Sequence, residues 1–324
     1  MKLYEIEERL RSFGAQNPRQ EAGILLEEYF GVSPARLLTL RDEDFSSPSL
    51  DKALKDREAR IPLQHILGKW EFMGKEFYVS KDCLIPRPDT EILVEKAIEI
   101  VKTRGGVDGN AECRMQNAKL NAKCKMQNAK LNAECRMQNA KLNVEAAIQG
   151  EAELRVADLC TGSGCIGLSL LMYGGLEKIT LMDISDGALK MATKNAQRHG
   201  LEHKCRFILG DITKDMPNDK FDLIVSNPPY IPTSHISALS PEVQKEPALA
   251  LDGGEDGLDI IRFLIGDGLG FLKENGAMLI EFGYDQGDTM DTLLREKRDT
   301  GSIKSYEILR DYGNNPRVAV IYAK

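Results

Sequence analysis

A short proline-containing loop carries the side chains best suited to chemistry. An apolar run at 221–225 is followed closely by Asn227-Pro228-Pro229-Tyr230. Two prolines fix the backbone and remove two N–H donors, which leaves the Asn227 side-chain oxygen and the Pro228 carbonyl as acceptors beside the flat wall of Tyr230. Such a loop suits a planar –NH2 group, which offers two donors. A rigid turn without chemistry is the alternative interpretation.

A glycine-rich loop further upstream is suited to a nucleotide-like cofactor. An apolar run at 154–159 leads into Cys160, Thr161, Gly162, Ser163 and Gly164. Glycines permit a tight turn and close approach of a ligand, and the helix expected next exposes free N–H groups at its start. Residues 162–167 also spell G-x-G-x-x-G, a pattern of dinucleotide sites that is weak when it stands alone. A purely structural turn is a further alternative.

Two acidic residues follow the next two expected strands. Asp183 is placed to accept hydrogen bonds from both hydroxyls of a ribose, and Asp211 with its apolar neighbour Ile212 suits an adenine. Ligands bind at the carboxyl ends of strands in open α/β sheets, so we expect these residues to meet Asn227 around one pocket. That clustering favours chemistry over a structural turn. Because nothing suggests a hydride acceptor site, it also weakens the dehydrogenase interpretation.

Alternating apolar runs and amphipathic segments predict the elements that position these residues. Strands are expected at 154–159, 178–182, 205–209, 221–225 and 277–282. Helices are expected at 165–173, 186–199 and 256–272, and a terminal hairpin at 306–310 and 317–323. This order predicts an α/β fold whose parallel sheet is covered on both faces.

The first 68 residues predict a small helical domain. Apolar residues recur at the spacing of one helical face at Ala22, Leu25, Leu26, Tyr29 and Phe30. Asn17-Pro18 gives this helix a plausible start, and Ser33-Pro34 opens a short one. Periodicity alone is compatible with simple compact packing or with a recognition module.

Residues 69–104 are interpreted as a linker. Two short strands around a Gly turn are expected between Trp70 and Val79. The prolines in 85–90 predict an extended stretch, and an amphipathic helix is expected from Thr90 to about Lys102.

A tandem repeat separates the linker from the domain expected at 151–324. Residues 110–142 read NAECRMQNAKL, NAKCKMQNAKL and NAECRMQNAKL. A period of 11 keeps equivalent residues nearly on one helical line, so the three repeat cysteines would be stacked. Without a CxxC pair or a His partner, no metal site is expected. We interpret 105–150 as an exposed insertion, either partly helical or disordered.

Composition excludes several classes of protein. The 324 residues are 42% hydrophobic and 29% charged, as in ordinary globular proteins. Neither a signal peptide nor an apolar run of about 18 residues is found, so we expect a cytoplasmic protein whose seven cysteines are free thiols. The net charge is −7, and the three repeat copies carry +5, which leaves −12 elsewhere. This balance argues against a nucleic-acid-binding surface.

The sequence resembles the release-factor glutamine N5-methyltransferases over nearly its whole length, the repeat excepted. The resemblance rests on segments in the linker, the two loops and the later domain: 62–68, 71–74, 84–91, 158–167, 195–196, 227–230, 246–254 and 281–283. The Ile-Pro-Arg-Pro stretch combined with Asn-Pro-Pro-Tyr makes the match specific. Cys160 is a departure, since many relatives carry Gly there, but a small Cys should be tolerated.

The resemblance implies a Rossmann-like class I methyltransferase sheet with a small N-terminal helical domain that helps to engage the substrate. It implies S-adenosylmethionine as cofactor, held by residues 160–164, Asp183, Ile212 and Asn227, with Asp211 beside them. It also implies that 227–230 hold the glutamine of the Gly-Gly-Gln sequence of peptide chain release factors. We expect a monomer without direct contact to nucleic acid.

Three competing functions remain at this point. An adenine amino-methyltransferase would use the same acceptor loop, but it would need base flipping and a basic surface. The same glutamine chemistry on a ribosomal protein is closer, and the third alternative is a scaffold that only binds the cofactor. Intact Asp183 and Asn227 argue against the scaffold.

Overall fold

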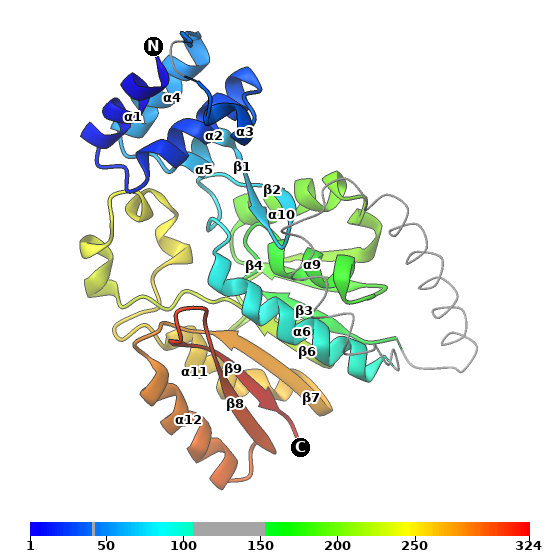
Figure 1. Cartoon of the computed structure of the whole chain (residues 1–324). Coiled ribbons are helices and arrows are strands. Elements are labelled where there is room, and N and C mark those ends of the chain that lie inside the picture. The colour runs from blue at the N-terminus through cyan, green and yellow to red at the C-terminus, as the bar shows by residue number, and fades with distance from the viewer. Residues whose placement is uncertain (41–42, 106–152) are drawn as a thin grey trace.

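The N-terminal helices pack around an apolar core of their own (Figure 1). In the computed structural model, which describes residues 1–40, 43–105 and 153–324, they are α1 Leu3–Ser12, α2 Pro18–Phe30, α3 Pro34–Leu37, α4 Pro48–Glu58 and α5 Leu63–Leu67. Ile6, Leu10, Leu25, Leu26 and Leu54 are fully buried. The predicted start of α3 is confirmed, because the Ser33 hydroxyl accepts a hydrogen bond from the Arg36 backbone N–H.

A hairpin and a helix connect this unit to the sheet. Strands β1 Lys69–Phe72 and β2 Lys75–Tyr78 pair antiparallel around Gly74, as predicted. The predicted extended stretch at 85–90 is wrong over its second half, since Pro88–Thr90 forms a 3-10 helix, η1, with proline at its first position. Helix α6 Glu91–Arg104 follows it directly.

The central sheet has a parallel part and an antiparallel part. Among the described residues seven strands pair in the order β5-β4-β3-β6-β7-β9-β8. The strands β3 Val156–Leu159, β4 Ile179–Asp183, β5 Cys205–Leu209, β6 Phe221–Ser226 and β7 Leu272–Glu281 are parallel. The predicted terminal hairpin, β8 Ser305–Arg310 with β9 Pro316–Tyr322, adds antiparallel to β7. The α/β class is confirmed, with a mixed sheet.

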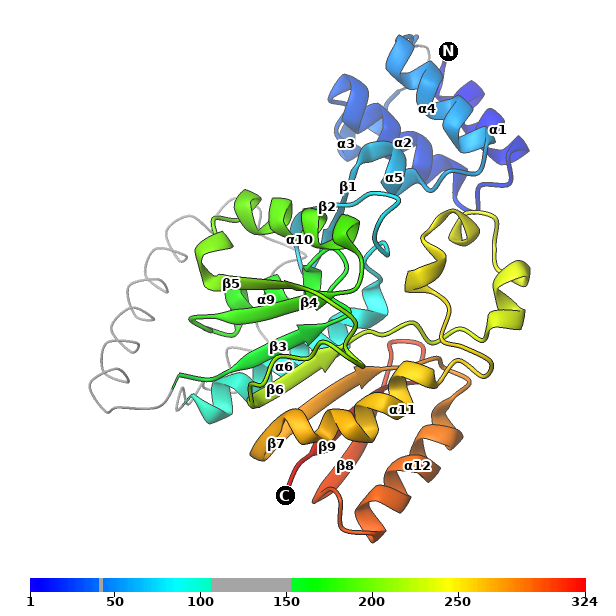
Figure 2. The same cartoon turned by 180° about the vertical axis from the view of Figure 1, so that it is seen from behind.

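Helices cover both faces of the sheet, as Figures 1 and 2 show from opposite sides. Helix α6, α9 Cys165–Tyr173 and α10 Asp186–Arg198 contribute to one apolar cluster. Helices α11 Asp259–Ile265 and α12 Gly287–Asp299 contribute to the other. The helix predicted over 256–272 is too long: Gly266 leaves the helical conformation, the 3-10 helix η6 Asp267–Phe271 follows, and β7 begins at Leu272.

A long loop between β6 and α11 reaches from the sheet to the N-terminal helices (Figures 1 and 2). We call residues 231–252 the 3-10 loop, because it contains η3 Thr233–Ala238, η4 Val243–Lys245 and η5 Ala248–Ala250. A parallel bridge between Ile231 and Asp252 closes its base.

The repeat and most of the expected insertion at 105–150 lie outside the described residues. Within the described part of the chain, no helix is long and apolar enough to cross a membrane.

Candidate active site

A cavity of about 280 Å³ lies where the parallel strands end. Its walls come from the stretch before α6, the glycine-rich loop, the ends of β4, β5 and β6, and the 3-10 loop. Of the residues predicted to form a site, it brings together Cys160, Thr161, Gly162, Ser163, Asp183, Asp211, Ile212, Asn227 and Pro229. The predicted meeting of the two loops at one edge of the sheet is thus present.

A buried carboxyl group, that of Asp158 in β3, holds the glycine-rich loop in shape. Asp158, fully buried, accepts hydrogen bonds on Oδ2 from the Thr161 hydroxyl at 2.6 Å and the Gly167 backbone N–H at 2.9 Å. Burial raises the pKa of Asp158 to about 7. A side chain at Gly167 would collide with Leu181 of β4, so this glycine lets α9 lie close to the sheet. No sequence pattern predicted this role of Asp158.

Cys160 and Gly162 adopt left-handed backbone conformations, with φ of 58° and 56°. Glycine reaches this region without the steric cost that a Cβ atom brings. This geometry explains why glycine suits position 160. Cysteine at this position brings the steric cost of a Cβ atom in a left-handed conformation. Burial raises the pKa of the Cys160 thiol, so the thiol stays protonated.

Asp183 is held in place by backbone groups on both sides. Its Oδ2 accepts the Gly162 N–H at 2.8 Å, and its Oδ1 accepts the Ser185 N–H at 2.9 Å. Burial raises the pKa of Asp183, and these bonds oppose the shift. Each carboxylate oxygen keeps a further lone pair, so the position still suits a pair of hydroxyl groups.

Asp211 lines the cavity, but its carboxylate is engaged by its own turn. Oδ1 accepts from the Thr213 backbone N–H at 2.9 Å and the Thr213 hydroxyl at 2.7 Å, and Oδ2 pairs with Lys214 at 2.7 Å. These bonds lower the pKa of Asp211 to about 2. A contact from Asp211 to an adenine amine therefore competes with them, whereas Ile212 presents a buried apolar surface.

Asn227 has the most distinctive environment in the cavity. Its Nδ2 donates to the Thr90 hydroxyl at 3.3 Å. Its Oδ1 is buried and has no hydrogen-bond partner among the described residues. Buried polar atoms in native proteins are nearly always paired, so this oxygen is free to accept a hydrogen bond from a ligand in the cavity.

Three of the predicted site residues do not line the cavity: Gly164, Pro228 and Tyr230. Tyr230 packs against the core cluster on the α11 side, and its hydroxyl donates to Glu281 Oε1 at 3.2 Å. A buried hydroxyl needs such a partner, which turns this side chain away from the cavity. Contact of Pro228 and Tyr230 with a substrate stays a prediction.

Several residues that complete the site were recognised from the sequence only as members of the segments that carry the family resemblance. Asn195 is fully buried and ties Tyr78 of the hairpin to the carbonyl of Ser163, at 2.6 to 2.9 Å. Glu246 of the 3-10 loop accepts the Ile85 N–H at 2.9 Å and also pairs with Arg87. The contacts of Asn195 with Tyr78 and of Glu246 with Ile85 and Arg87 join residues more than 100 positions apart, so no local pattern predicts them.

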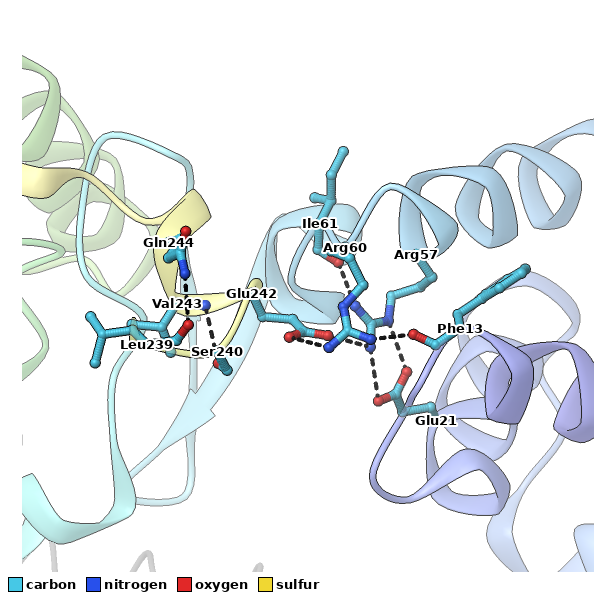
Figure 3. A network of polar contacts seen from close by, with 10 residues as sticks. All are labelled: Phe13, Glu21, Arg57, Arg60, Ile61, Leu239, Ser240, Glu242, Val243 and Gln244. Atoms are coloured by element: carbon cyan, nitrogen blue, oxygen red, sulfur yellow. Dashed lines mark hydrogen bonds and ion pairs between the residues drawn. The ribbon is translucent and has the colours of Figure 1, made fainter. Parts of the chain in front are cut away.

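The 3-10 loop also contacts the N-terminal helices (Figure 3). Glu242 pairs with Arg60 at 2.9 Å and with Arg57 at 3.5 Å. Arg57, only 3% exposed, also binds Glu21 at 2.9 Å and the Ile61 carbonyl at 2.8 Å. One carboxylate thus joins a wall of the cavity to the helical unit.

Comparisons with known proteins agree with this geometry. The family model described as the PrmC N-terminal domain matches residues 3–68, and the one described as the methyltransferase small domain matches residues 129–244. The release factor glutamine methyltransferase of Moorella thermoacetica is 32% identical over 99% of this chain and 97% of its own. That of Rhodospirillum rubrum is 33% identical over 95% of this chain and 80% of its own.

A solved structure shares the fold over most of the chain. The hMettl16 catalytic domain, determined in complex with MAT2A 3'UTR hairpin 6, aligns with a TM-score of 0.52 at 16% identity. The alignment covers 88% of this chain and 85% of that one. This likeness concerns the fold alone.

Proposed function

Because the chain belongs to the release factor glutamine methyltransferase family, we propose that it methylates peptide chain release factors in the cytoplasm. The methyl group passes from S-adenosylmethionine to the side-chain amide nitrogen, N5, of the Gly-Gly-Gln glutamine. The observation that carries the proposal is the buried, unpartnered Oδ1 of Asn227 at the cavity wall. A primary amide brings the N–H donor that this oxygen lacks.

The described residues fit the cofactor. Asp183 offers its remaining lone pairs to two ribose hydroxyls, Ile212 offers an apolar surface to the adenine, and the glycine-rich loop admits a ligand close to its backbone. When bound, S-adenosylmethionine supplies an electrophilic methyl group on its sulfonium sulfur. The left-handed turn at 160–164 leaves room for it, because a Cβ added at Gly162 would meet no atom within 4 Å.

The protein contributes positioning and hydrogen-bond acceptors. An amide nitrogen is a weak nucleophile because its lone pair is delocalised into the carbonyl. Asn227 Oδ1 and the Pro228 carbonyl hold the two N–H groups so that the nitrogen faces the methyl group, and both acceptors favour the positive charge that develops on nitrogen. The nitrogen–carbon bond forms as the carbon–sulfur bond breaks, and the nitrogen then loses one proton to water. No general base is required.

The N-terminal helices are proposed to recognise the release factor. The 3-10 loop lines the cavity with Pro247, Leu249 and Ala250, and Glu242 of the same loop binds Arg57 and Arg60. A protein docked on the helices therefore lies next to the wall of the cavity. This link predicts that a whole release factor is a better substrate than a short peptide.

The decisive experiment is mass spectrometry of a purified release factor incubated with the enzyme and S-adenosylmethionine. We expect a mass gain of one CH2 that maps to the Gly-Gly-Gln glutamine. Reactions without cofactor are the control. Methylation of a ribosomal protein or of adenine in RNA, with the release factor unchanged, would replace the proposal by one of its competitors.

A further inference from the structure

A buried glutamine holds the end of the Asn-Pro-Pro-Tyr loop and has no part in the mechanism so far. Gln286 immediately precedes α12 and is 7% exposed. Its Nε2 donates to the Tyr230 carbonyl at 2.9 Å, and to the carbonyls of Gly257 and Asp256 at 3.3 and 3.4 Å. Its Oε1 accepts the Gly283 backbone N–H at 2.8 Å. A reversed amide would set oxygen against carbonyls, so the –NH2 group must face Tyr230.

The other end of the loop is anchored to the central sheet. The Ser226 hydroxyl, fully buried, donates to the Leu159 carbonyl at 2.8 Å. Leu159 is the last residue of β3 and directly precedes the glycine-rich loop. The Asn-Pro-Pro-Tyr loop is therefore held at its start by Ser226 and at its end by Gln286, and the two prolines between these anchors stiffen it.

Two glycines after the 3-10 loop lie against the carbonyls that end the Asn-Pro-Pro-Tyr loop. A Cβ atom at Gly253 would come within 2.8 Å of the Pro229 oxygen, and one at Gly257 within 2.3 Å of the Tyr230 oxygen. Both distances are too short for a Cβ atom, so glycine permits this close packing. The Pro228 carbonyl, the second acceptor of the proposed mechanism, has no competing hydrogen-bond donor among the described residues.

We propose that Gln286 is a positioning residue: by holding the Tyr230 carbonyl, it fixes the shape of the Asn-Pro-Pro-Tyr loop and so the place of its two acceptors. The inference rests on the proposed function, because it concerns how the same site holds the –NH2 group of glutamine. The hydrogens of a planar –NH2 group have a fixed separation. Asn227 Oδ1 and the Pro228 carbonyl can therefore meet both hydrogens only if the loop keeps one shape, and a small misplacement costs rate.

The test replaces Gln286 by methionine, which is of similar length but has no N–H donor. We expect Gln286→Met to lower kcat for a purified release factor roughly tenfold, as for the loss of one hydrogen bond to a buried carbonyl. The Kd of S-adenosylhomocysteine, measured by calorimetry, should not change, because no hydrogen bond of Gln286 reaches Asp183 or the glycine-rich loop. Gln197→Met, which removes an exposed hydrogen bond to Glu202, is the control and should leave kcat unchanged.

A double-mutant cycle separates positioning from a general loss of stability. The two acceptors act together on one –NH2 group, so Gln286→Met should lower the rate by a smaller factor in the Asn227→Ala background than in the wild type. A merely structural role predicts the same factor in both backgrounds. Single-turnover methylation of the release factor gives the four rates, and circular dichroism shows whether each variant is folded.

Three results overturn the positioning role: equal kcat for Gln286→Met and wild type, the same factor in both backgrounds, or an equal loss of affinity for S-adenosylhomocysteine. If Gln286→Met does not fold, Gly257→Ala decides, because its Cβ atom would displace the same Tyr230 carbonyl. A lower kcat at unchanged affinity then supports the role, and an unchanged kcat overturns it. Failure of both variants to fold assigns the contact to folding alone and also overturns it.

These outcomes leave the proposed function intact. A wild type that leaves the release factor unmethylated overturns both proposals.

Discussion

The side of the cavity proposed to bind the cofactor, with Asp183 and Asp211, and the side proposed to receive the substrate amide, with Asn227, differ in how their polar groups are satisfied. We call them the cofactor half and the acceptor half. In the cofactor half, both oxygens of Asp183 and both oxygens of Asp211 already bond to neighbouring groups of the chain. In the acceptor half, the Asn227 oxygen has no partner among the described residues. The two carboxylates of the cofactor half are therefore held in place before a ligand arrives, although the buried Ser163 hydroxyl beside them has no partner among the described residues. The Asn227 oxygen of the acceptor half is left for the substrate.

This difference separates binding from catalysis. Polar groups that are already paired within the chain carry little desolvation cost when the cofactor is absent. Their role is to keep the cofactor half of the cavity in shape. An unpaired buried acceptor carries a desolvation cost that a correctly placed N–H relieves. Interactions that strengthen in the transition state are the ones that raise the rate, so changes in the acceptor half should affect kcat most.

The largest effect is expected for Asn227→Ala. Removing one preorganised polar group of this kind typically costs about a hundredfold to a thousandfold in kcat. Affinity for S-adenosylhomocysteine should remain measurable, because the cofactor half keeps its own bonds. Single-turnover methylation of the release factor measures the loss, and unchanged turnover would refute the role of Asn227.

A smaller effect, confined to the cofactor, is expected for Asp183→Ala. Loss of hydrogen bonds to a charged group corresponds to about 1.5–3 kcal/mol, or roughly tenfold to a hundredfold in the Kd of S-adenosylhomocysteine. Asp211→Ala is the matched comparison and should weaken binding less, because Thr213 and Lys214 already engage that carboxylate. Calorimetry on both variants tests the contrast, and an equal or larger loss in Asp211→Ala would contradict it.

Glu242→Gln should act on substrate recognition alone. The change weakens the ion pairs to Arg57 and Arg60, and we expect KM for whole release factor to rise a few-fold, in the range of a partly exposed ion pair. Activity on a short Gly-Gly-Gln peptide should not change. Asp56→Asn, which breaks the exposed pair with Lys52, is the control.

Removal of residues 1–68 should impair methylation of whole release factor more strongly than Glu242→Gln does. Turnover that stayed at the level of the full chain would contradict the recognition role of the helices.

The smallest effect is expected from deletion of residues 110–143. The repeat lies between α6 and β3 in sequence and overlaps neither the glycine-rich loop nor the Asn-Pro-Pro-Tyr loop. Rate and thermal midpoint should stay close to those of the full chain, measured by methylation assay and circular dichroism. A deletion product that fails to fold would show that the insertion is integral.

The sequence predicted those parts of the molecule that depend on local pattern. Strands β3 to β6, helices α9 and α10 and the terminal hairpin follow from apolar periodicity and turn residues. Helix α12 was not predicted, although the apolar spacing of Met290, Leu293 and Leu294 fits it. The 3-10 loop has no such period, because its prolines interrupt every regular pattern.

The candidate site divides in the same way. The residues of both loops are recognisable because their types and spacing are local. The contact of Thr90 with Asn227 is not local, since it spans 137 positions. Asp158 contacts Thr161 and Gly167 only 3 and 9 positions away, but no periodic pattern marks it as the residue that shapes the loop. Long-range contacts of single side chains leave no periodic trace in a sequence.

Asn195 connects the hairpin to the glycine-rich loop through hydrogen bonds. The same amide group bonds the hairpin that continues into the N-terminal helices and the carbonyl of Ser163 in the glycine-rich loop, where the cofactor is proposed to bind. If the cofactor and a protein substrate both order the contacts of Asn195, each raises the affinity of the enzyme for the other. By thermodynamic reciprocity, the two gains in binding free energy are equal. One buried side chain would then couple the proposed cofactor site to the proposed docking surface of the helices.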